Sequence, residues 1–422
     1  MASMLTREDR VTDMAATQLT AAQIPDHIPP ECVWDNDFSA FLAEGDDPYR
    51  AGGRLHDGPG VIWATNASFG MPSWIFTHHR TVQEGFANAK KFSSLRGPLT
   101  EAVMDPGWML LPVESDAPFH QHYRQVLRPF FTPEAIDARQ AEVQALTDRL
   151  IDAFIDRGEC EFVGEFASIL PNAMVVSLMG LPQEMLHQFL EWEETAIHGN
   201  SHAEQLSAGI AIHDYLRDFI AEQQRTGEPA SELMAAILAG QMADRPFNQD
   251  EILGVVYLLF IAGLDTVFSS MGWMMKHLAT DPALQDRLRN NPQDMPAAVD
   301  EFTRAFGVSA PSRIVAEDLV FEGVPMKKGE HILLPTYLAG RDPRAFPDPH
   351  VIDIDRRPRH VTFGLGSHLC IGIHLAKREM KIMIETFLRR MNNIRVAEDK
   401  PCTYHTSNTI GLDCLPLEWD PI

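Results

Sequence analysis

Residues 363–372 read Phe363-Gly364-Leu365-Gly366-Ser367-His368-Leu369-Cys370-Ile371-Gly372, which places one cysteine between glycines and directly before a helical pattern. Glycine allows tight turns and lets a flat molecule approach the backbone closely. The first turn of a helix presents unpaired N–H groups and the positive end of the helix dipole, and both favour a thiolate. Taken alone, these residues leave two interpretations open: an inert cysteine in a glycine-rich turn, or a thiolate that binds iron.

The helix expected after this cysteine is amphipathic. Apolar residues recur at the i, i+3, i+4 and i+7 spacing of one helix face, and basic residues fall mostly on the opposite face. The apolar positions are Met380, Met383, Ile384, Phe387, Leu388 and Met391, and the basic positions are Lys377, Arg378, Lys381, Arg389 and Arg390. We therefore predict a surface helix over residues 372–391 with one basic side.

A longer helix is predicted over residues 248–279, and it should cross the protein interior. Asn248 with Glu251 three residues later is typical of an N-cap with a capping box, and Pro282 follows the predicted end. Residues 252–268 are apolar almost all round, which indicates burial on every side. A helix of about 30 residues is about 45 Å long, so only a large domain can bury it.

The middle of this long helix carries the sequence Ala262-Gly263-Leu264-Asp265-Thr266. A buried aspartate is costly unless it is paired or functional, and glycine lowers helix propensity. Threonine can donate its hydroxyl to a carbonyl one turn earlier and open the helix locally. These residues alone indicate either a bend with a satisfied aspartate or a pair that handles protons.

Two short regions favour β-structure. In the first, residues 61–65 and 74–77 flank an Asn/Ser/Gly turn. In the second, residues 321–324 and 332–334 flank the sequence Lys327-Lys328-Gly329, which we expect to form a hairpin-like turn. The predicted fold class is therefore mainly α with a minor β region.

The 422-residue chain is acidic, with 59 Asp+Glu against 35 Lys+Arg and a formal net charge of −24. Polyphosphate would repel such a protein, so we expect no nucleic-acid partner. Its five cysteines are odd in number and form no Cys-x-x-Cys pair. This pattern argues against both a disulfide framework and a zinc ribbon.

The chain shows no internal repeat and no low-complexity linker. We expect a flexible N-terminal segment over residues 1–24 and a single domain over residues 25–422. The longest apolar run, residues 252–264, is shorter than the roughly 18 residues that suggest a membrane span. Residues 1–30 hold charges and prolines rather than the apolar stretch of a signal peptide. We therefore expect a cytoplasmic monomer that does not enter a membrane.

The pattern Phe-Gly-x-Gly-x-His-x-Cys-x-Gly in residues 363–372 resembles, position for position, the haem-binding signature of the cytochrome P450 family. The resemblance extends from about Pro25 to the C-terminus and is strongest to soluble bacterial members of the camphor-hydroxylase type. It implies a haem-thiolate monooxygenase that holds haem b (iron protoporphyrin IX) through the thiolate of Cys370. It also implies the cytochrome P450 fold, with haem between the long central helix and the helix after the cysteine loop.

The resemblance assigns roles to further residues. Asp265 and Thr266 match the family's acid–alcohol pair, so Asp265 would deliver protons and Thr266 would order water beside the oxygen site. Glu301, Arg304 and Arg356 match a structural triad that locks the region behind the cysteine loop. The residues expected to bind haem are His120, Arg124, Ala262, Arg313, Phe363, Gly364, His368 and Gly372.

The expected substrate pocket is mostly apolar and offers few polar anchors. Trp108 stands where camphor-hydroxylase-type members have a tyrosine that hydrogen-bonds the substrate ketone, and an indole N–H is a donor in a different place. The pocket-lining residues are expected to be Trp108, Leu110, Val113, Leu258, Ile261, Ala262 and Ser309. We expect a small hydrophobic substrate: a terpenoid, camphor-like, or an ionone-type norisoprenoid.

Nothing in the sequence suggests a flavin or iron–sulfur domain of the chain's own, so electrons must come from outside. Basic residues flank the cysteine loop, at Arg357, Arg359, Lys377 and Arg378. We expect an acidic 2Fe-2S ferredoxin, reduced by an NAD(P)H-dependent ferredoxin reductase, to dock on them. A solvated basic helix face is the simpler alternative.

Two other functions stay open at this point. The first is a peroxygenase that uses hydrogen peroxide and needs no redox partner. The second is a non-enzymatic haem-thiolate sensor. Both functions could dispense with a proton relay, so the sequence Asp265-Thr266 favours an enzyme that reduces O2.

Overall fold

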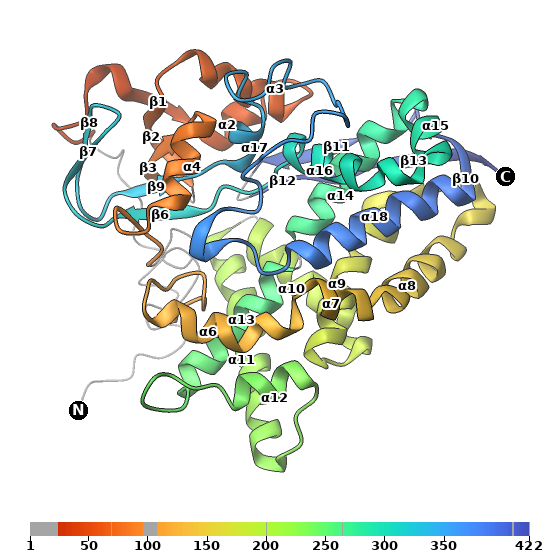
Figure 1. Ribbon diagram of the computed structural model, residues 1–422, viewed down its shortest axis with the longest axis horizontal. Helices are drawn as coiled ribbons and strands as arrows, with labels where there is room; N and C mark the ends of the chain where they lie inside the picture. Colours follow the sequence, from red (N-terminus) through yellow and green to blue (C-terminus); the bar gives the residue numbers. More distant parts are fainter. Residues whose placement is uncertain are drawn as a thin grey trace.

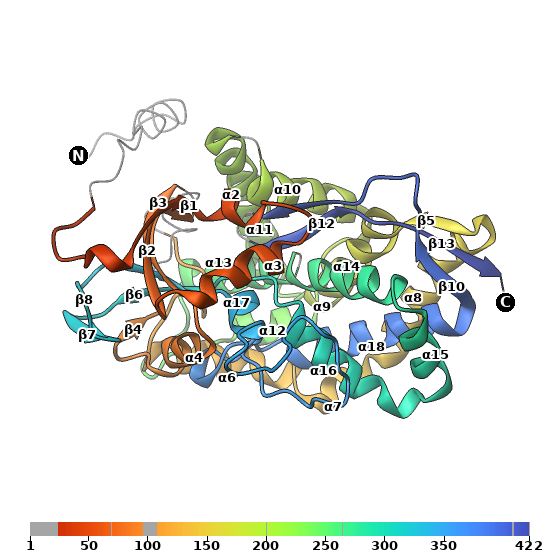
Figure 2. The ribbon, with the colours of Figure 1, turned by 90° about the horizontal axis from the view of Figure 1, so that it is seen from above.

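The computed structural model describes residues 24–68, 70–95, 108–199, 201–263, 265–406 and 409–421. The segment predicted to be flexible, residues 1–24, therefore lies outside the described residues except for Ile24. A sheet-rich part occupies one side of the molecule, and helices make up the rest (Figure 1). The view from above shows that the sheet-rich part and the C-terminus lie at opposite ends of the long axis (Figure 2).

The main sheet joins strands from both halves of the chain. Its order is β1 (Val33–Asp37), β2 (Val61–Ser68), β3 (Met71–Phe76), β9 (His331–Leu333), β6 (Ser312–Val315) and β4 (Phe92–Ser93). β2 and β3 pair antiparallel with Trp63 opposite Trp74, and β3 pairs parallel with β9 with Trp74 opposite Ile332. The strands predicted around Val61 and Trp74 are thus confirmed.

The second predicted β region has a different turn from the one expected. The hairpin consists of β7 (Leu319–Phe321) and β8 (Val324–Met326) and turns at Glu322 and Gly323, whose φ angles are 52° and 78°. Two successive positive φ angles match the twist of a tight two-residue hairpin, and Gly323 makes the second one easy to adopt. The predicted turn at Lys327-Lys328-Gly329 is present, since the Glu330 N–H donates to the Lys327 carbonyl at 3.1 Å. It is not the turn of a hairpin, because β8 before it pairs with β7, whereas β9 after it pairs with β3 and β6.

Two smaller sheets lie near the C-terminus. One has the order β10 (Met391–Val396), β13 (Pro416–Pro421) and β5 (Glu159–Glu161), and the other pairs β11 (Thr403–Thr406) with β12 (Ile410–Cys414). An isolated bridge joins Ser309 to Thr409, just before β12. This bridge brings a C-terminal residue toward the centre of the molecule.

The long central helix is interrupted in the middle. It consists of α13 (Gln249–Ala262) and α14 (Thr266–Ala279), so the helix is interrupted at the sequence where a local opening or bend was predicted. The predicted capping box is confirmed, since the Asn248 side chain accepts from the Glu251 N–H and Glu251 accepts from the Asn248 N–H, both at 2.8 Å. By length and composition Gln249–Ala279 could cross a membrane, but 53% of its most apolar window is buried inside the protein, as in a core helix.

Most of the remaining chain is helical. The other helices are α2 (Phe38–Leu42), α3 (Pro48–Gly53), α4 (His79–Ala87), α6 (Phe119–Leu127), α7 (Pro133–Ala138), α8 (Gln140–Asp152), α9 (Ile169–Met179), α10 (Leu186–His198), α11 (His202–Thr226), α12 (Glu232–Leu238), α15 (Pro282–Asn290), α16 (Met295–Ala305), α17 (Thr336–Gly340) and α18 (Ile373–Arg390). α18 is the amphipathic helix predicted after the cysteine. Its apolar face, which includes Met383 and Phe387, is buried against α8, α15 and α16.

Candidate active site around Cys370

The cysteine loop is shaped by glycine and by one backbone hydrogen bond. Gly364 and Gly366 have φ angles of 70° and 67°, a region that glycine adopts without steric cost. The Cys370 N–H donates to the Phe363 carbonyl at 2.8 Å, which closes the loop. Gly372 then caps α18, so Cys370 lies directly before the helix N-terminus as predicted.

The Cys370 thiol is surrounded by protein atoms but is still accessible from one side. Burial raises its pKa, while N–H groups of Gly372 and Ile373 and the charge of Arg124 act in the opposite direction. The residue nevertheless remains exposed, and so does Ala262 at the end of the central helix α13. A deep thiol that no side chain covers, beside stabilising N–H groups, suits a cysteine that ligates a large cofactor.

Four basic side chains, which we call the basic cluster, gather beside this loop: His120 and Arg124 on α6, Arg313 on β6 and His368 in the loop itself. The rings of His120 and His368 have centroids 4.1 Å apart. Burial, followed by the charge of Arg124, lowers the pKa of His120 to about 4. Burial, followed by His120, lowers the pKa of His368 to about 3. Burial also lowers the pKa of Arg313 to about 10.

The basic cluster has little negative charge of its own. Asp116 is the carboxylate that acts on His120 and Arg313, and it already accepts hydrogen bonds from the Ser93 hydroxyl and the Ser94 N–H. Buried charges that are so poorly compensated are costly, and charge-assisted hydrogen bonds to carboxylates would relieve that cost. Haem carries two carboxylates, so the donors of the basic cluster fit its propionates.

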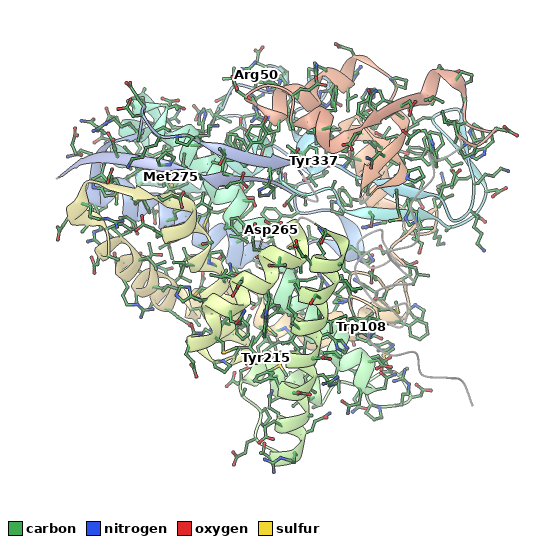
Figure 3. All side chains as sticks on the ribbon, turned by 180° about the vertical axis from the view of Figure 1, so that it is seen from behind. Arg50, Trp108, Tyr215, Asp265, Met275 and Tyr337 are labelled. Carbon is green, nitrogen blue, oxygen red and sulfur yellow. The ribbon has the colours of Figure 1, made fainter. Side chains whose placement is uncertain are left out.

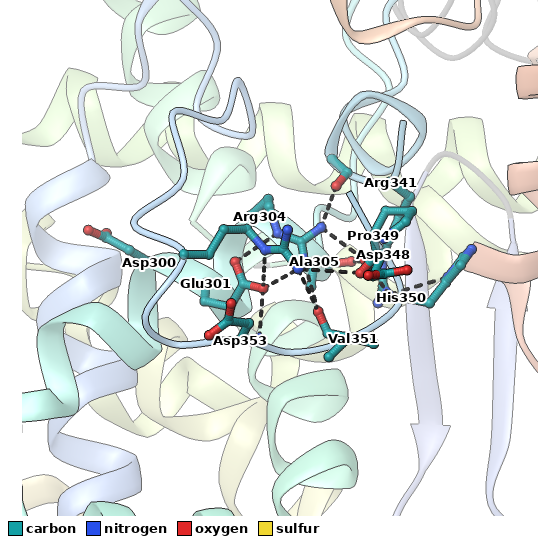
Figure 4. Close-up of polar contacts among 12 residues, drawn as sticks. Asp300, Glu301, Arg304, Ala305, Arg341, Asp348, Pro349, His350, Val351 and Asp353 are labelled. Carbon is teal, nitrogen blue, oxygen red and sulfur yellow. Dashed lines mark hydrogen bonds and ion pairs between the residues drawn. The ribbon is translucent and has the colours of Figure 1, made fainter. Parts of the chain in front are cut away.

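The three residues of the predicted triad, which we call the charged triad, do meet. Figure 4 shows Glu301 and Arg304 side by side. Arg304 donates two hydrogen bonds to Glu301, at 2.8 and 2.7 Å, and both side chains are fully buried. Arg356 adds a third hydrogen bond to Glu301 at 3.1 Å. Arg304 also donates to the Gly340 carbonyl at 2.6 Å, and a Cβ at Gly340 would lie 2.1 Å from the Arg304 carbonyl oxygen. The charged triad therefore fixes α16 against α17 and the chain that follows it.

α16 also contacts the segment that leads into the cysteine loop. The Thr362 hydroxyl donates to the Thr303 carbonyl at 2.8 Å, and the Thr303 hydroxyl lies 3.2 Å from Nε2 of His360. Thr303 lies next to Arg304 in the middle of the charged triad. The helix that carries the triad thus contacts the segment before the cysteine loop through Thr303.

The break between α13 and α14 holds a buried aspartate. Asp265 accepts hydrogen bonds from the Ser269 hydroxyl at 3.0 Å and from the Thr409 hydroxyl at 2.6 Å. The Thr266 hydroxyl donates to the Ala262 carbonyl at 3.4 Å, one turn earlier. A Cβ at Gly263 would lie 2.4 Å from the Val175 side chain, so the close approach of α9 requires glycine there.

The sequence analysis missed Ser269 and Thr409. Ser269 lies four residues after Asp265, a spacing that places both on one helix face and could have revealed it. Thr409 is 144 residues away in sequence, and no local pattern announces such a contact. Asp265 is therefore a buried aspartate whose carboxylate is hydrogen-bonded, and it lies at the break between α13 and α14.

The predicted pocket residues lie in different surroundings. Trp108 stacks on His213 of α11, with ring centroids 3.5 Å apart and planes 3° apart. Together with Leu110 they line a pocket whose other lining residues are Met109, Asp250, Leu253, Gly254 and Tyr257. The other predicted pocket residues, namely Val113, Leu258, Ile261, Ala262 and Ser309, are not among those that line this pocket.

The predicted basic patch is partly neutralised. Lys377 donates to Asp300 at 2.6 Å, and Arg378 pairs with Asp137. Arg357 and Arg359 remain exposed. A pocket lined in part by Asp137, Asp300, Lys377 and Arg378 lies on this face, between α7, α16 and α18. The patch is thus a mixed surface with two exposed arginines rather than a uniformly basic one.

Comparisons with known proteins point to one family. The model of the family "Cytochrome P450" matches residues 173–418. A probable cytochrome P450 127A1 from Sinorhizobium fredii is 30% identical over 97% of this chain and 100% of its own length. A steroid C26-monooxygenase from Mycobacterium tuberculosis is 29% identical over 73% of this chain and 86% of its own length.

Solved structures of similar proteins have the same architecture. The crystal structure of cytochrome P450 CYP101C1 superposes with a TM-score of 0.83 at 30% identity, covering 94% of this chain and 100% of that one. The structure of CYP101J2 gives the same TM-score and coverage at 27% identity. The fold class predicted from sequence is thereby confirmed.

Proposed function

The chain belongs to the cytochrome P450 family of cysteine-ligated haem monooxygenases, and on this premise we propose that it hydroxylates a small hydrophobic terpenoid or norisoprenoid. Two electrons per turnover would come from a 2Fe-2S ferredoxin reduced by an NAD(P)H-dependent reductase. One observation carries the haem-thiolate assignment: the uncovered Cys370 thiol lies at a helix N-terminus beside a basic cluster whose carboxylate, Asp116, is already hydrogen-bonded to Ser93 and Ser94.

When bound, haem supplies the activation of O2, with one oxygen atom entering a C–H bond and the other leaving as water. The Cys370 thiolate would hold the iron, and Gly372 N–H would stabilise its charge. The basic cluster would hold the propionates. The remaining haem contacts that we propose are Ala262, Phe363, Gly364 and Gly372.

We assign proton handling to Asp265 and Thr266. Releasing one oxygen atom as water consumes two protons, and they must enter a pocket that excludes bulk water. The hydroxyls of Ser269 and Thr409 hold the Asp265 carboxylate in place at the helix break. Thr266 would orient water beside the reacting centre. This arrangement favours an enzyme that reduces O2 over a peroxygenase or a sensor.

The substrate class rests on the pocket residues. Trp108 and Leu110 line a mostly apolar pocket between α11 and α13, and the Trp108 indole offers one N–H donor. We propose that Val113, Leu258, Ile261, Ala262 and Ser309 complete the substrate site once haem is bound. The proposed set of residues is apolar except for the Trp108 N–H and the Ser309 hydroxyl, which suits a compact ketone of the camphor or ionone type.

We further propose that the ferredoxin docks at Arg357 and Arg359, beside Lys377 and Arg378. The two arginines are exposed, and an acidic partner would meet them in an otherwise acidic protein. We propose a monomeric cytoplasmic enzyme with a single domain over residues 25–422. Charge reversal at Arg357 and Arg359 should slow electron transfer and reduce its dependence on salt.

A spectral titration of the purified ferric protein tests the function directly. A small terpenoid that displaces water from the iron should move the Soret band from its low-spin to its high-spin position. Turnover with an NADH-driven ferredoxin system should then yield the alcohol. A protein whose spectrum is thiolate-like but unmoved by camphor, ionones and related ketones would contradict the substrate class. Product formation with hydrogen peroxide alone, at the rate seen with ferredoxin, would contradict the electron source.

A further inference from the structure

A second buried carboxyl group, Glu193, lies near the helix break. Glu193 is on α10 and is 2% exposed, whereas its neighbour Glu194 on the same helix is exposed. Within the part of the chain that the structure describes, Oε1 of Glu193 has no hydrogen-bond partner. An ionised carboxylate that is buried without hydrogen-bond donors is very costly, so we expect this side chain to be protonated or to have a function.

An aromatic contact joins the face of α10 that carries Glu193 to α13, which ends just before Asp265. Glu193 lies one turn beyond Phe189, so the two side chains share one face of α10. Phe189 packs edge-on against Phe260 of α13, with ring centroids 5.2 Å apart. Asp265 follows Phe260 by five residues and lies near the centre of the molecule, where the helices meet the sheet-rich part (Figure 3). The face of α10 that carries Glu193 therefore packs against α13 within a few residues of the helix break.

Electrostatics agrees with this placement. Burial and then the charge of Asp265 raise the pKa of Glu193 well above its usual range, ahead of the effect of Glu194. α10 packs against α9 and α11. α9 carries no charged residue, and among the described residues of α11 none contributes to this shift. The charges that act on Glu193 are thus two carboxylates, and neither can hold it ionised.

The two carboxyl groups differ in their donors. Asp265 accepts hydrogen bonds from two hydroxyls, which favour a charged acceptor, whereas Oε1 of Glu193 has none. Two neighbouring carboxyls that are buried together do not both ionise, and the one with fewer donors keeps the proton. The proton of this pair therefore resides on Glu193.

We propose that Glu193 is a positioning residue that stores one proton beside Asp265. When the reaction draws a proton through the helix break, Glu193 transfers its proton through one water to the Asp265 carboxylate, and Asp265 passes that proton on. Glu193 becomes a carboxylate in that step and regains a proton from solvent, and no electron is exchanged. The inference rests on the proton-delivery role proposed for Asp265.

Infrared spectroscopy of the holoprotein reads the stored proton without relying on turnover. A protonated carboxyl has a C=O stretch separate from that of carboxylates, and this band shifts in D2O. The wild-type-minus-Glu193→Gln difference spectrum at neutral pH should contain this band, and the same difference for the exposed Glu194→Gln should not. Glu379 is another buried acid, and burial raises its pKa to about 8, so its own band should persist in Glu193→Gln.

Coupling between the two acids is tested by Asp265→Asn. Removing the like charge should move the pH at which the Glu193 band disappears downward by about one pH unit. A difference spectrum without a carboxyl band at neutral pH would overturn the inference. A band whose titration is the same in Asp265→Asn as in the wild type would also overturn it.

Turnover separates this inference from the proposed function. With the ferredoxin system, Glu193→Gln should lower the fraction of electrons recovered in product by about tenfold and flatten its pH profile. Glu193→Asp should restore part of that fraction, and Glu194→Gln should match the wild type. If Asp265→Asn loses product while Glu193→Gln keeps both product and pH profile, the inference fails and the proposed function stands. If Asp265→Asn itself has no effect, the proton role of Asp265 fails.

Discussion

The charged triad and the basic cluster are both groups of ionisable side chains inside the protein, but only in the triad are the positive and negative charges paired with each other. In the triad, Glu301 and Arg304 are fully buried and meet in a bidentate ion pair, with backbone carbonyls taking the remaining donors. In the basic cluster, burial lowers the pKa of Arg313, His120 and His368, and the nearby Asp116 already accepts two other hydrogen bonds. A buried cluster that pairs its own charges supports the fold, whereas a buried cluster of one sign is prepared for a ligand.

Breaking the triad should have the largest effect. Glu301→Gln leaves Arg304 as an uncompensated buried charge, so the free energy of unfolding should fall by about 3–5 kcal/mol, with or without haem. Denaturant unfolding of the apoprotein and holoprotein measures it. Asp300→Asn is the matched control, because Asp300 is on the same helix but is half exposed, and its loss should cost less than about 1 kcal/mol. Equal losses for the two variants would contradict a self-contained triad.

Removing a charge from the basic cluster should have different effects on the apoprotein and the holoprotein. Arg313→Leu removes a desolvated cation, so the apoprotein should unfold no more easily than the wild type. The holoprotein should release haem roughly 10 to 100 times faster, because a charge-assisted hydrogen bond is worth about 1.5–3 kcal/mol. Denaturant unfolding and the rate of haem transfer to an excess of acceptor protein give the two values. A loss of stability in the apoprotein as large as that of Glu301→Gln would erase the distinction between the two clusters.

The pH dependence of the apoprotein sharpens the same contrast. His120 and His368 titrate at about 4 and about 3 when folded, whereas unfolded histidine titrates near about 6.5. The unfolded state therefore binds more protons in this window, and the apoprotein should lose stability as pH falls from about 6.5 toward 4, by up to about 3 kcal/mol for His120. Replacing both histidines with glutamine should flatten this slope in chemical unfolding. In the holoprotein the propionates should reduce the slope, and an unchanged slope there would show that they lie elsewhere.

The smallest effect is expected at the glycines of the loop. Gly364→Ala places a side chain at a φ of 70° and should cost about 1 kcal/mol. Gly323→Ala is matched to it, because its φ is 78° and nothing lies within 4 Å of the added methyl. The two variants should unfold alike, but only Gly364→Ala should release haem faster. Equal haem release would remove the loop from the haem site.

Local patterns in the sequence predicted the local features well. The Asn248–Glu251 capping box, the strands around Trp63 and Trp74, and the amphipathic helix after Cys370 all depend on neighbours within a few residues. The turn at Gly323 was missed because Lys327-Lys328-Gly329 carries a similar turn composition, and only the strand pairing distinguishes the two.

Distant contacts explain what the sequence did not reveal. The hydrogen bond from Thr409 to Asp265 spans 144 residues, and the contact between Arg378 and Asp137 spans 241 residues. Glu193 was overlooked for the same reason, since nothing in the sequence of α10 indicates that Asp265 acts on it from the break between α13 and α14. The sequence around Gly263 was predicted to weaken the helix. The close approach of α9, which leaves no room for a side chain at Gly263, could not be predicted from it.

The parallel pairing of β3 with β9 also sets the order in which the chain can fold during synthesis. Trp74 pairs with Ile332, and 257 residues lie between them in the sequence. The ribosome must add these residues before β9 can pair with β3. At about 5–20 residues per second the ribosome takes roughly 13–50 s to supply that partner. During this interval the β2–β3 ribbon has an unpaired edge, which is where non-native association of strands begins. The yield of folded protein in the cell should therefore depend on chaperones that occupy that edge while the rest of the chain is made.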